Sequence, residues 1–105
     1  MALTRDFKET VMERARHDPV FREELLREGV ECLLVGDVET GKILLRDYIN
    51  ATIGFEELGS LTKKSPKSLM RMFGPSGNPQ ARNLFEVVSR IQVHEGIQLK
   101  VQAIR

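Results

Sequence analysis

The chain of 105 residues has one cysteine and no tryptophan, and the cysteine count alone excludes two kinds of site. A single Cys32 cannot form an internal disulfide, and it cannot build a zinc site that needs several thiolates. Cys32 lies in the apolar stretch VECLLV, where a small buried hydrophobe is the more ordinary role and a nucleophile the rarer one.

Long apolar runs are also missing. No stretch approaches the roughly 18 residues that a membrane-spanning helix needs, and the opening MALTRDFKET lacks the basic and then apolar pattern of a signal peptide. We therefore expect a cytoplasmic protein with no membrane partner. With 41% hydrophobic and 30% charged residues, the chain is too apolar for wholesale disorder. Its length fits one domain, or one domain with an extension.

Acidic residues are absent from one continuous window, residues 58–85. Residues 1–57 carry eight Lys/Arg and thirteen Asp/Glu, a net charge of −5, whereas residues 58–105 carry eight basic and two acidic residues, a net charge of +6. Such a separation is typical of a protein that binds a polyanion with one side, although chance clustering on a solvated surface gives the same counts. The basic residues in the window are Lys63, Lys64, Lys67, Arg71 and Arg82.

The first half of the chain has helical periodicity. Apolar residues recur every three or four positions, so we expect helices over residues 4–16, 19–35 and 38–53. The residues expected to begin or end these helices are Thr4, Asp18, Pro19, Gly36, Asp37 and Gly54.

Two short helices are expected next, over residues 55–62 and 66–73, joined by a tight turn. Ser65 is a good N-cap for the second of them, and Pro66 suits its first position. Its inward-facing residues are predicted to be Leu69, Met72 and Phe73. Two short helices joined in this way and flanked by longer ones form a helix-turn-helix, whose second helix lies in the major groove of DNA.

The second short helix has the outer face that reading DNA requires. Lys67, Ser68 and Arg71 supply basic and small polar side chains, and no neighbouring carboxylate would face the phosphates. The loop GPSGNP that follows is rich in glycine but lacks the Lys-Ser/Thr of a nucleotide-binding loop. The sequence therefore predicts double-stranded DNA as the partner. After this loop, Asn78 is expected to cap a last helix that begins at Pro79 and stops at Gly96.

The period changes after Gly96. Ile97, Leu99 and Val101 alternate with polar residues, which predicts a half-buried strand over residues 97–105. No other segment indicates a strand, so its partner would be its own copy in a homodimer or a sheet edge on another protein. Ile97, Leu99 and Val101 are therefore the expected dimerisation residues.

The order of residues from about Gly36 to Val101 resembles the lambda-repressor-like (Xre-type) helix-turn-helix domain. More closely, it is similar to the HigA-like antidote proteins of bacterial toxin–antitoxin modules. The most specific piece is SPKSLMRMFGPSGNPQARNLFEVV. The fold expected is a mostly α helix-turn-helix bundle over residues 36–96, with an N-terminal helical extension over 1–35 and a C-terminal β-strand over 97–105.

The resemblance also assigns residues to DNA. In the family, the residues aligned with Ser65, Lys67, Ser68 and Arg71 face the groove, and the loop aligned with Ser76 to Asn78 touches the DNA backbone. Many members turn on a glycine, whereas this chain turns at Thr62-Lys63-Lys64, which leaves a Lys near a position that favours positive φ. The small residue needed where the helices cross is Gly59. The expected DNA-binding residues are Lys63, Lys64, Ser65, Lys67, Ser68, Arg71, Ser76 and Asn78.

The resemblance implies a sequence-specific transcriptional regulator, the antitoxin and autorepressor of a type II toxin–antitoxin module. It implies a homodimer on a palindromic operator, with a cognate toxin as a basic partner for the acidic residues 1–57. The alternatives are a solitary prophage-type repressor and a module that binds a toxin without DNA. An enzyme is the weakest alternative, because His17 and His94 lie far apart and neither has a Cys or paired carboxylates nearby. No cofactor and no metal is expected.

Overall fold

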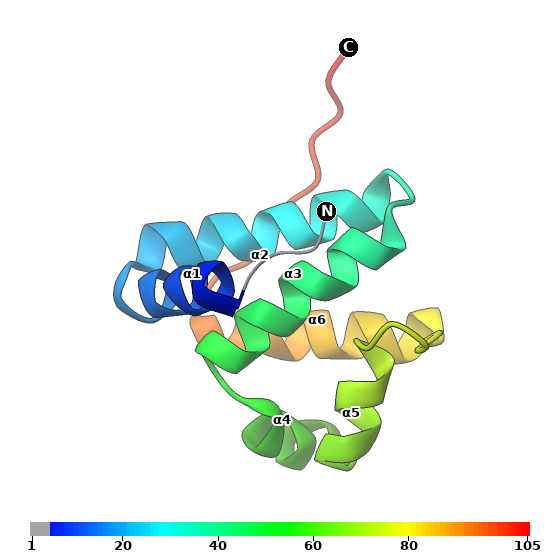
Figure 1. Cartoon of the computed structure of the whole chain (residues 1–105). Helices are drawn as coiled ribbons and strands as arrows, with labels where there is room; N and C mark the ends of the chain where they lie inside the picture. The colour runs from blue at the N-terminus through cyan, green and yellow to red at the C-terminus, as the bar shows by residue number, and fades with distance from the viewer. Residues whose placement is uncertain (1–4) are drawn as a thin grey trace.

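The computed structural model describes residues 5–105 of the chain, and in this part the fold is built from six helices (Figure 1). They lie close to the expected segments, but the last begins two residues later than expected. Thr4, the expected cap of the first helix, lies outside the described residues. The helices are α1 (Arg5–His17), α2 (Pro19–Leu34), α3 (Val38–Ala51), α4 (Phe55–Thr62), α5 (Pro66–Met72) and α6 (Ala81–Glu95).

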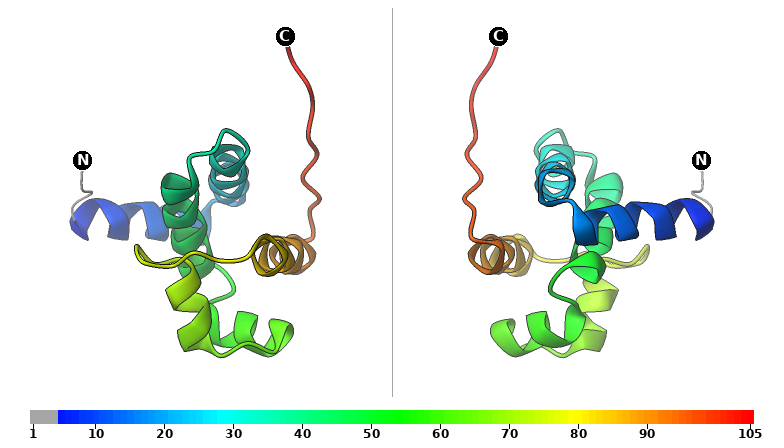
Figure 2. Two further views of the ribbon diagram at one scale, coloured as in Figure 1. Left: turned by 90° about the vertical axis from the view of Figure 1, so that its right-hand side faces the viewer. Right: turned by 90° about the vertical axis from the view of Figure 1, so that its left-hand side faces the viewer.

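The prediction of a C-terminal β-strand is wrong: residues 5–105 are helical or irregular and contain no strand. Residues 97–105 leave the end of α6 as an extended tail that borders a groove with α2 and ends beyond the helices (Figure 2). Ile97 and Leu99 pack against the core, and the Leu99 N–H donates to Oε1 of Gln92 at 2.8 Å. The alternating pattern therefore predicted correctly that the side chains of Ile97 and Leu99 face inward. A strand also needs a second extended backbone beside it, and the rest of the described chain consists of helices joined by short loops.

Side-chain caps fix where α2 and α3 begin. The Asp18 carboxylate accepts hydrogen bonds from the N–H groups of Val20 and Phe21, and that of Asp37 accepts one from Thr40. Each cap satisfies backbone donors that the first turn of a helix leaves free. Both expected caps are confirmed, and the turns before α2 and α3 are correspondingly short.

One hydrophobic core passes through all six helices. The most extensive helix contact is between α2 and α3, which cross closely because Gly41 has no side chain: a Cβ there would lie 2.8 Å from Cδ2 of Leu33. The short helices α4 and α5 close the far end of the core (Figure 1). They are therefore held by packing against the longer helices. Side chains buried in this core include Leu26, Leu45, Ile49, Leu58, Leu69 and Val87.

A polar network fastens the end of α6 to α2 and α3. Oε1 of Glu95 accepts a hydrogen bond from the Tyr48 hydroxyl at 2.6 Å and one from Nε of Arg22 at 2.8 Å. Arg22 also donates to the Ala15 carbonyl at 2.9 Å. Burial, and after it the hydrogen bond to Glu95, raises the pKa of Tyr48 far above its ordinary value. The network thus sets the position of α6 relative to the N-terminal helices.

Candidate nucleic-acid interface

The turn between α4 and α5 depends on two unusual backbone positions. Lys63 ends α4 in the left-handed conformation, with φ 58° and ψ 35°, as the sequence indicated. The Lys64 N–H then donates to the Gly59 carbonyl at 3.1 Å, which folds the turn back over α4. A Cβ on Gly59 would lie 2.7 Å from the Lys64 carbonyl oxygen, so only glycine fits there. The requirement for a small residue at position 59 is confirmed.

Helix α5 begins at a side-chain cap and is anchored along one face. The Ser65 hydroxyl oxygen accepts a hydrogen bond from the Ser68 N–H at 3.1 Å, and Pro66 is the first helical residue. On the inner face Leu69 and Phe73 are buried, and the Phe73 ring packs on that of Phe55 with centroids 6.3 Å apart. The opposite face is left to solvent. The exposed residues of this outer face are Lys67, Ser68, Met70 and Arg71.

The structure leaves seven of the eight predicted DNA-binding residues exposed. The exception is Lys64, which is half-buried and lies 3.7 Å from Oε1 of Glu86 on α6. The Ser65 hydroxyl is already used as the helix cap and also hydrogen-bonds to the Ser68 hydroxyl at 2.9 Å. The Ser65 side chain is therefore already engaged in capping α5. The exposed residues of the set are Lys63, Ser65, Lys67, Ser68, Arg71, Ser76 and Asn78.

Four of these residues line a single shallow depression. It lies between the outer face of α5, the loop between α5 and α6 (residues 73–80), and the first turn of α6. Its lining contains no carboxylate, so nothing in it would repel a phosphate. Lys63 and Lys67 lie outside this depression, on the turn and at the start of α5. The polar residues that line it are Ser68, Arg71, Ser76, Asn78, Gln80 and Asn83.

Residues 78–80 do not join α6 as expected. The helix begins at Ala81 with Gln80 as its N-cap, so Asn78 is not the cap and Pro79 is not the first helical residue. A residue before proline is pushed toward extended backbone, and Gln80 is itself extended, with φ −66° and ψ 145°. The extended segment carries the chain from the 73–80 loop to α6. As a result Asn78 is exposed on the loop.

The 73–80 loop is held from inside by a lysine that sequence reasoning missed. Lys42 on α3 is only 1% exposed, and its Nζ donates to the carbonyl oxygens of Gly74 at 3.0 Å and Gly77 at 2.8 Å. Nζ also lies 3.2 Å from Oε1 of Glu39. A signal was present in the sequence: position 42 lies one residue after the buried Gly41 and three before the buried Leu45, on the apolar face of α3.

The three expected dimerisation residues are not equivalent. Ile97 and Leu99 are half-buried against their own core, whereas Val101 is 80% exposed. Val101 and Ile104 on the tail face a groove whose other wall is α2, with Val30 and Leu34 among its residues. Of the three, Val101 alone keeps most of its side chain available to another chain.

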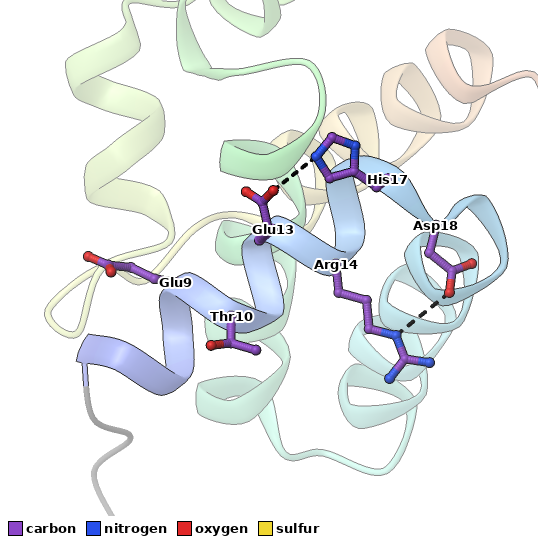
Figure 3. Close-up of a pocket in the computed structure, with 6 residues that line it drawn as sticks. All are labelled: Glu9, Thr10, Glu13, Arg14, His17 and Asp18. Atoms are coloured by element: carbon purple, nitrogen blue, oxygen red, sulfur yellow. Dashed lines mark hydrogen bonds and ion pairs between the residues drawn. The ribbon is translucent and has the colours of Figure 1, made fainter.

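Another hollow lies along α1 and is lined by residues 9–18 (Figure 3). His17 is 3.0 Å from the Glu13 carboxylate, and Nε of Arg14 is 3.6 Å from that of Asp18. Both are exposed pairs of residues four positions apart in the sequence, which contribute little to stability. They do not converge on a common point in the way that a nucleophile and its base would.

Comparisons of the chain with protein-family models, with curated proteins and with solved structures found no match. The function is therefore inferred from the chain's own residues. Within residues 5–105, none of the helices has both the length and the apolar character needed to cross a membrane.

Proposed function

We propose that the chain is a sequence-specific, DNA-binding transcriptional regulator of the helix-turn-helix type, related to the lambda-repressor-like domains, that acts in the cytoplasm. The observation that carries the proposal is the two-sided character of α5. Leu69 fixes one face in the core, and Lys67, Ser68 and Arg71 project from the other. In helix-turn-helix proteins the second short helix enters the major groove, where such side chains contact base edges and neighbouring loops contact phosphates.

A module that binds only protein is the competing function. Helix-in-groove recognition of a protein uses an apolar stripe on the exposed face of a helix. The outer face of α5 offers one large apolar side chain, Met70, which is 49% exposed, between the basic Lys67 and Arg71. The adjoining depression contains no acid. This combination favours a polyanion over an apolar protein groove.

Titration of labelled duplex DNA with the full chain tests the proposal. Fluorescence anisotropy is measured on a duplex that carries the chain's own promoter and on a scrambled duplex of equal composition. We expect the promoter to bind about 10³-fold or more tightly than the scrambled duplex. Both affinities should fall with added salt, because phosphate contacts release counterions. Equal affinity for the two duplexes at every salt concentration would contradict sequence-specific regulation.

The proposed regulator binds as a homodimer. One helix-turn-helix contacts one half-site, and a two-fold dimer reads two half-sites about one helical turn apart. Exposed apolar side chains for such an interface lie along the tail and the end of α2: Val101, Ile104, Leu34 and Val35. Clustered exposed apolar residues of this kind are typical of interaction surfaces. The stoichiometry of the same titration measures the assembly, and we expect two chains per promoter duplex.

In the antitoxin form of this function, the acidic half of the chain also binds a basic toxin. The carboxylates of Glu23 and Glu28 are exposed on α2, which lies on the side of the molecule away from α4 and α5 (Figure 1). A basic protein held there would leave α5 free for DNA. Glu24 and Glu31, also on α2, are already paired with Arg27.

Co-purification of the tagged chain with the product of the adjacent reading frame measures this partnership. We expect a complex that the Glu23→Gln/Glu28→Gln variant weakens by at least tenfold, since each rim charge lost removes about 1 kcal/mol of attraction. The matched control is Glu56→Gln/Glu57→Gln on α4, which removes the same charge from the other end of the molecule. A complex that is insensitive to the α2 variant would rule out the acidic surface as the binding site.

A further inference from the structure

Lys42 is a buried cation whose two hydrogen bonds both go to the 73–80 loop. A lysine is rarely fully buried unless its charge is paired, because taking an ammonium group out of water is costly. Two loop carbonyls accept hydrogen bonds from Nζ, and the Glu39 carboxylate pairs with its charge at 3.2 Å. Gly74 and Gly77 are 32 and 35 residues away along the chain. Lys42 therefore fixes the shape of the 73–80 loop.

The contact with Gly77 also sets the direction of the next N–H group. The carbonyl oxygen of Gly77 points inward to Nζ of Lys42 at 2.8 Å. In a trans peptide the N–H lies opposite the carbonyl, and the described part of the chain has no cis peptide bond. The N–H of Asn78 is therefore directed away from Lys42. It makes no hydrogen bond to another backbone group of residues 5–105.

The held loop is pressed against the end of α5. A Cβ on Gly77 would lie 2.0 Å from the Arg71 carbonyl oxygen and 2.7 Å from that of Met72, so the loop backbone approaches α5 as closely as glycine permits. The side chains of Arg71 and Asn78 line the same depression. The outward N–H of Asn78 thus belongs to the surface that carries the basic side chain of α5.

We propose that Lys42 is a positioning residue for DNA binding. It does not touch DNA; it holds the 73–80 loop so that the backbone N–H of Asn78 donates to a DNA phosphate. Backbone N–H groups are common phosphate donors in protein–DNA complexes, and oriented loop amides form anion-binding concavities. This inference rests on the proposed function and adds a residue to it that is remote from the DNA surface.

The test uses the full chain and its Lys42→Met/Glu39→Gln variant, which keeps the net charge and removes the donors to the loop. Backbone amide NMR spectra are recorded with and without promoter duplex. In the wild type we expect the Asn78 amide to shift on binding. In the variant the Asn78 shift should be lost, while the amides of Ser68 and Arg71 still respond. If the substitutions only loosened the packing of the protein, the responses of the Ser68 and Arg71 amides would change together with that of Asn78.

Affinity provides the second readout of the same variant. Binding to the promoter and to the scrambled duplex should weaken by the same factor, roughly 10- to 100-fold, which is the worth of one hydrogen bond to a charged group. Their ratio should stay that of the wild type, because a phosphate contact carries no base information. An unchanged affinity, or a ratio that collapses, overturns the role of Lys42.

Two outcomes separate this inference from the proposed function. If the wild-type chain does not bind DNA, the proposed function fails, and the role of Lys42 fails with it. If the wild type binds but its Asn78 amide does not move, only the role of Lys42 is overturned. This second measurement needs no variant, so it can overturn the role of Lys42 even if the double substitution prevents folding.

Discussion

A chain in which both Lys67 and Arg71 are replaced by alanine should bind its promoter duplex about 10²- to 10⁴-fold more weakly than the wild type. Each side chain that reads a base contributes about 1–3 kcal/mol, and both project from the exposed face of α5. They are one helical turn apart, so their effects can couple and the range is broad. Fluorescence anisotropy with promoter and scrambled duplexes measures the loss, and preference for the promoter should fall as well.

The control for this variant removes the same charge elsewhere. Arg90 on α6 and Lys100 on the tail are exposed and lie outside the depression beside α5. Their joint replacement by alanine should change promoter affinity by less than about tenfold, through the long-range field alone. Lys63→Ala should weaken both duplexes alike, as expected of a phosphate contact. Unchanged promoter affinity in Lys67→Ala/Arg71→Ala would remove α5 as the reading helix.

The Glu95→Ala variant should lose about 2–3 kcal/mol of free energy of unfolding. Removing one partner of a buried ion pair costs about 3–5 kcal/mol, and the Arg22–Glu95 pair is not wholly buried, with 18% and 16% of the side chains exposed. The buried Tyr48 hydroxyl would also lose its acceptor. Urea unfolding can be followed by tyrosine fluorescence, because Tyr48 is the one tyrosine in a chain without tryptophan.

Glu95→Gln separates the charge from the hydrogen bond. Its amide oxygen can still accept from Tyr48, so the loss should be smaller than in Glu95→Ala. The two substitutions shorten or neutralise the same side chain and leave α6 otherwise unchanged. An unfolding midpoint of Glu95→Ala equal to that of the wild type would mean that α6 is held by apolar packing alone.

Local signals in the sequence predicted α4, α5 and the turn between them well. Ser65 and Pro66 begin α5, Leu69 and Phe73 anchor it, and Gly59 allows the turn to fold back. Each of these features depends on residues within a few positions of one another. Capping chemistry and apolar spacing therefore contain enough information to predict them.

Features that depend on distant segments were missed. The hydrogen-bond partners of Lys42 follow it by more than 30 residues, so its place on the apolar face of α3 indicates burial but not which groups it binds. The start of α6 depends on how the loop bound by Lys42 rejoins the bundle. Alternation in residues 97–105 predicted which side faces inward at Ile97, but it carries no information about whether a second extended segment exists to pair with the tail.

At Lys63, the stability of the fold and the positive charge of the side chain favour different residues. In residues 5–105, Lys63 is the one residue other than glycine with positive φ, a conformation that costs a side-chain-bearing residue about 1 kcal/mol. Glycine at this position would relieve the strain and make the protein more stable. It would also delete a cation at the corner between α4 and α5. A chain optimised for thermal resistance would therefore drift toward glycine here, and the lysine persists only where the lost charge matters more than the gained stability.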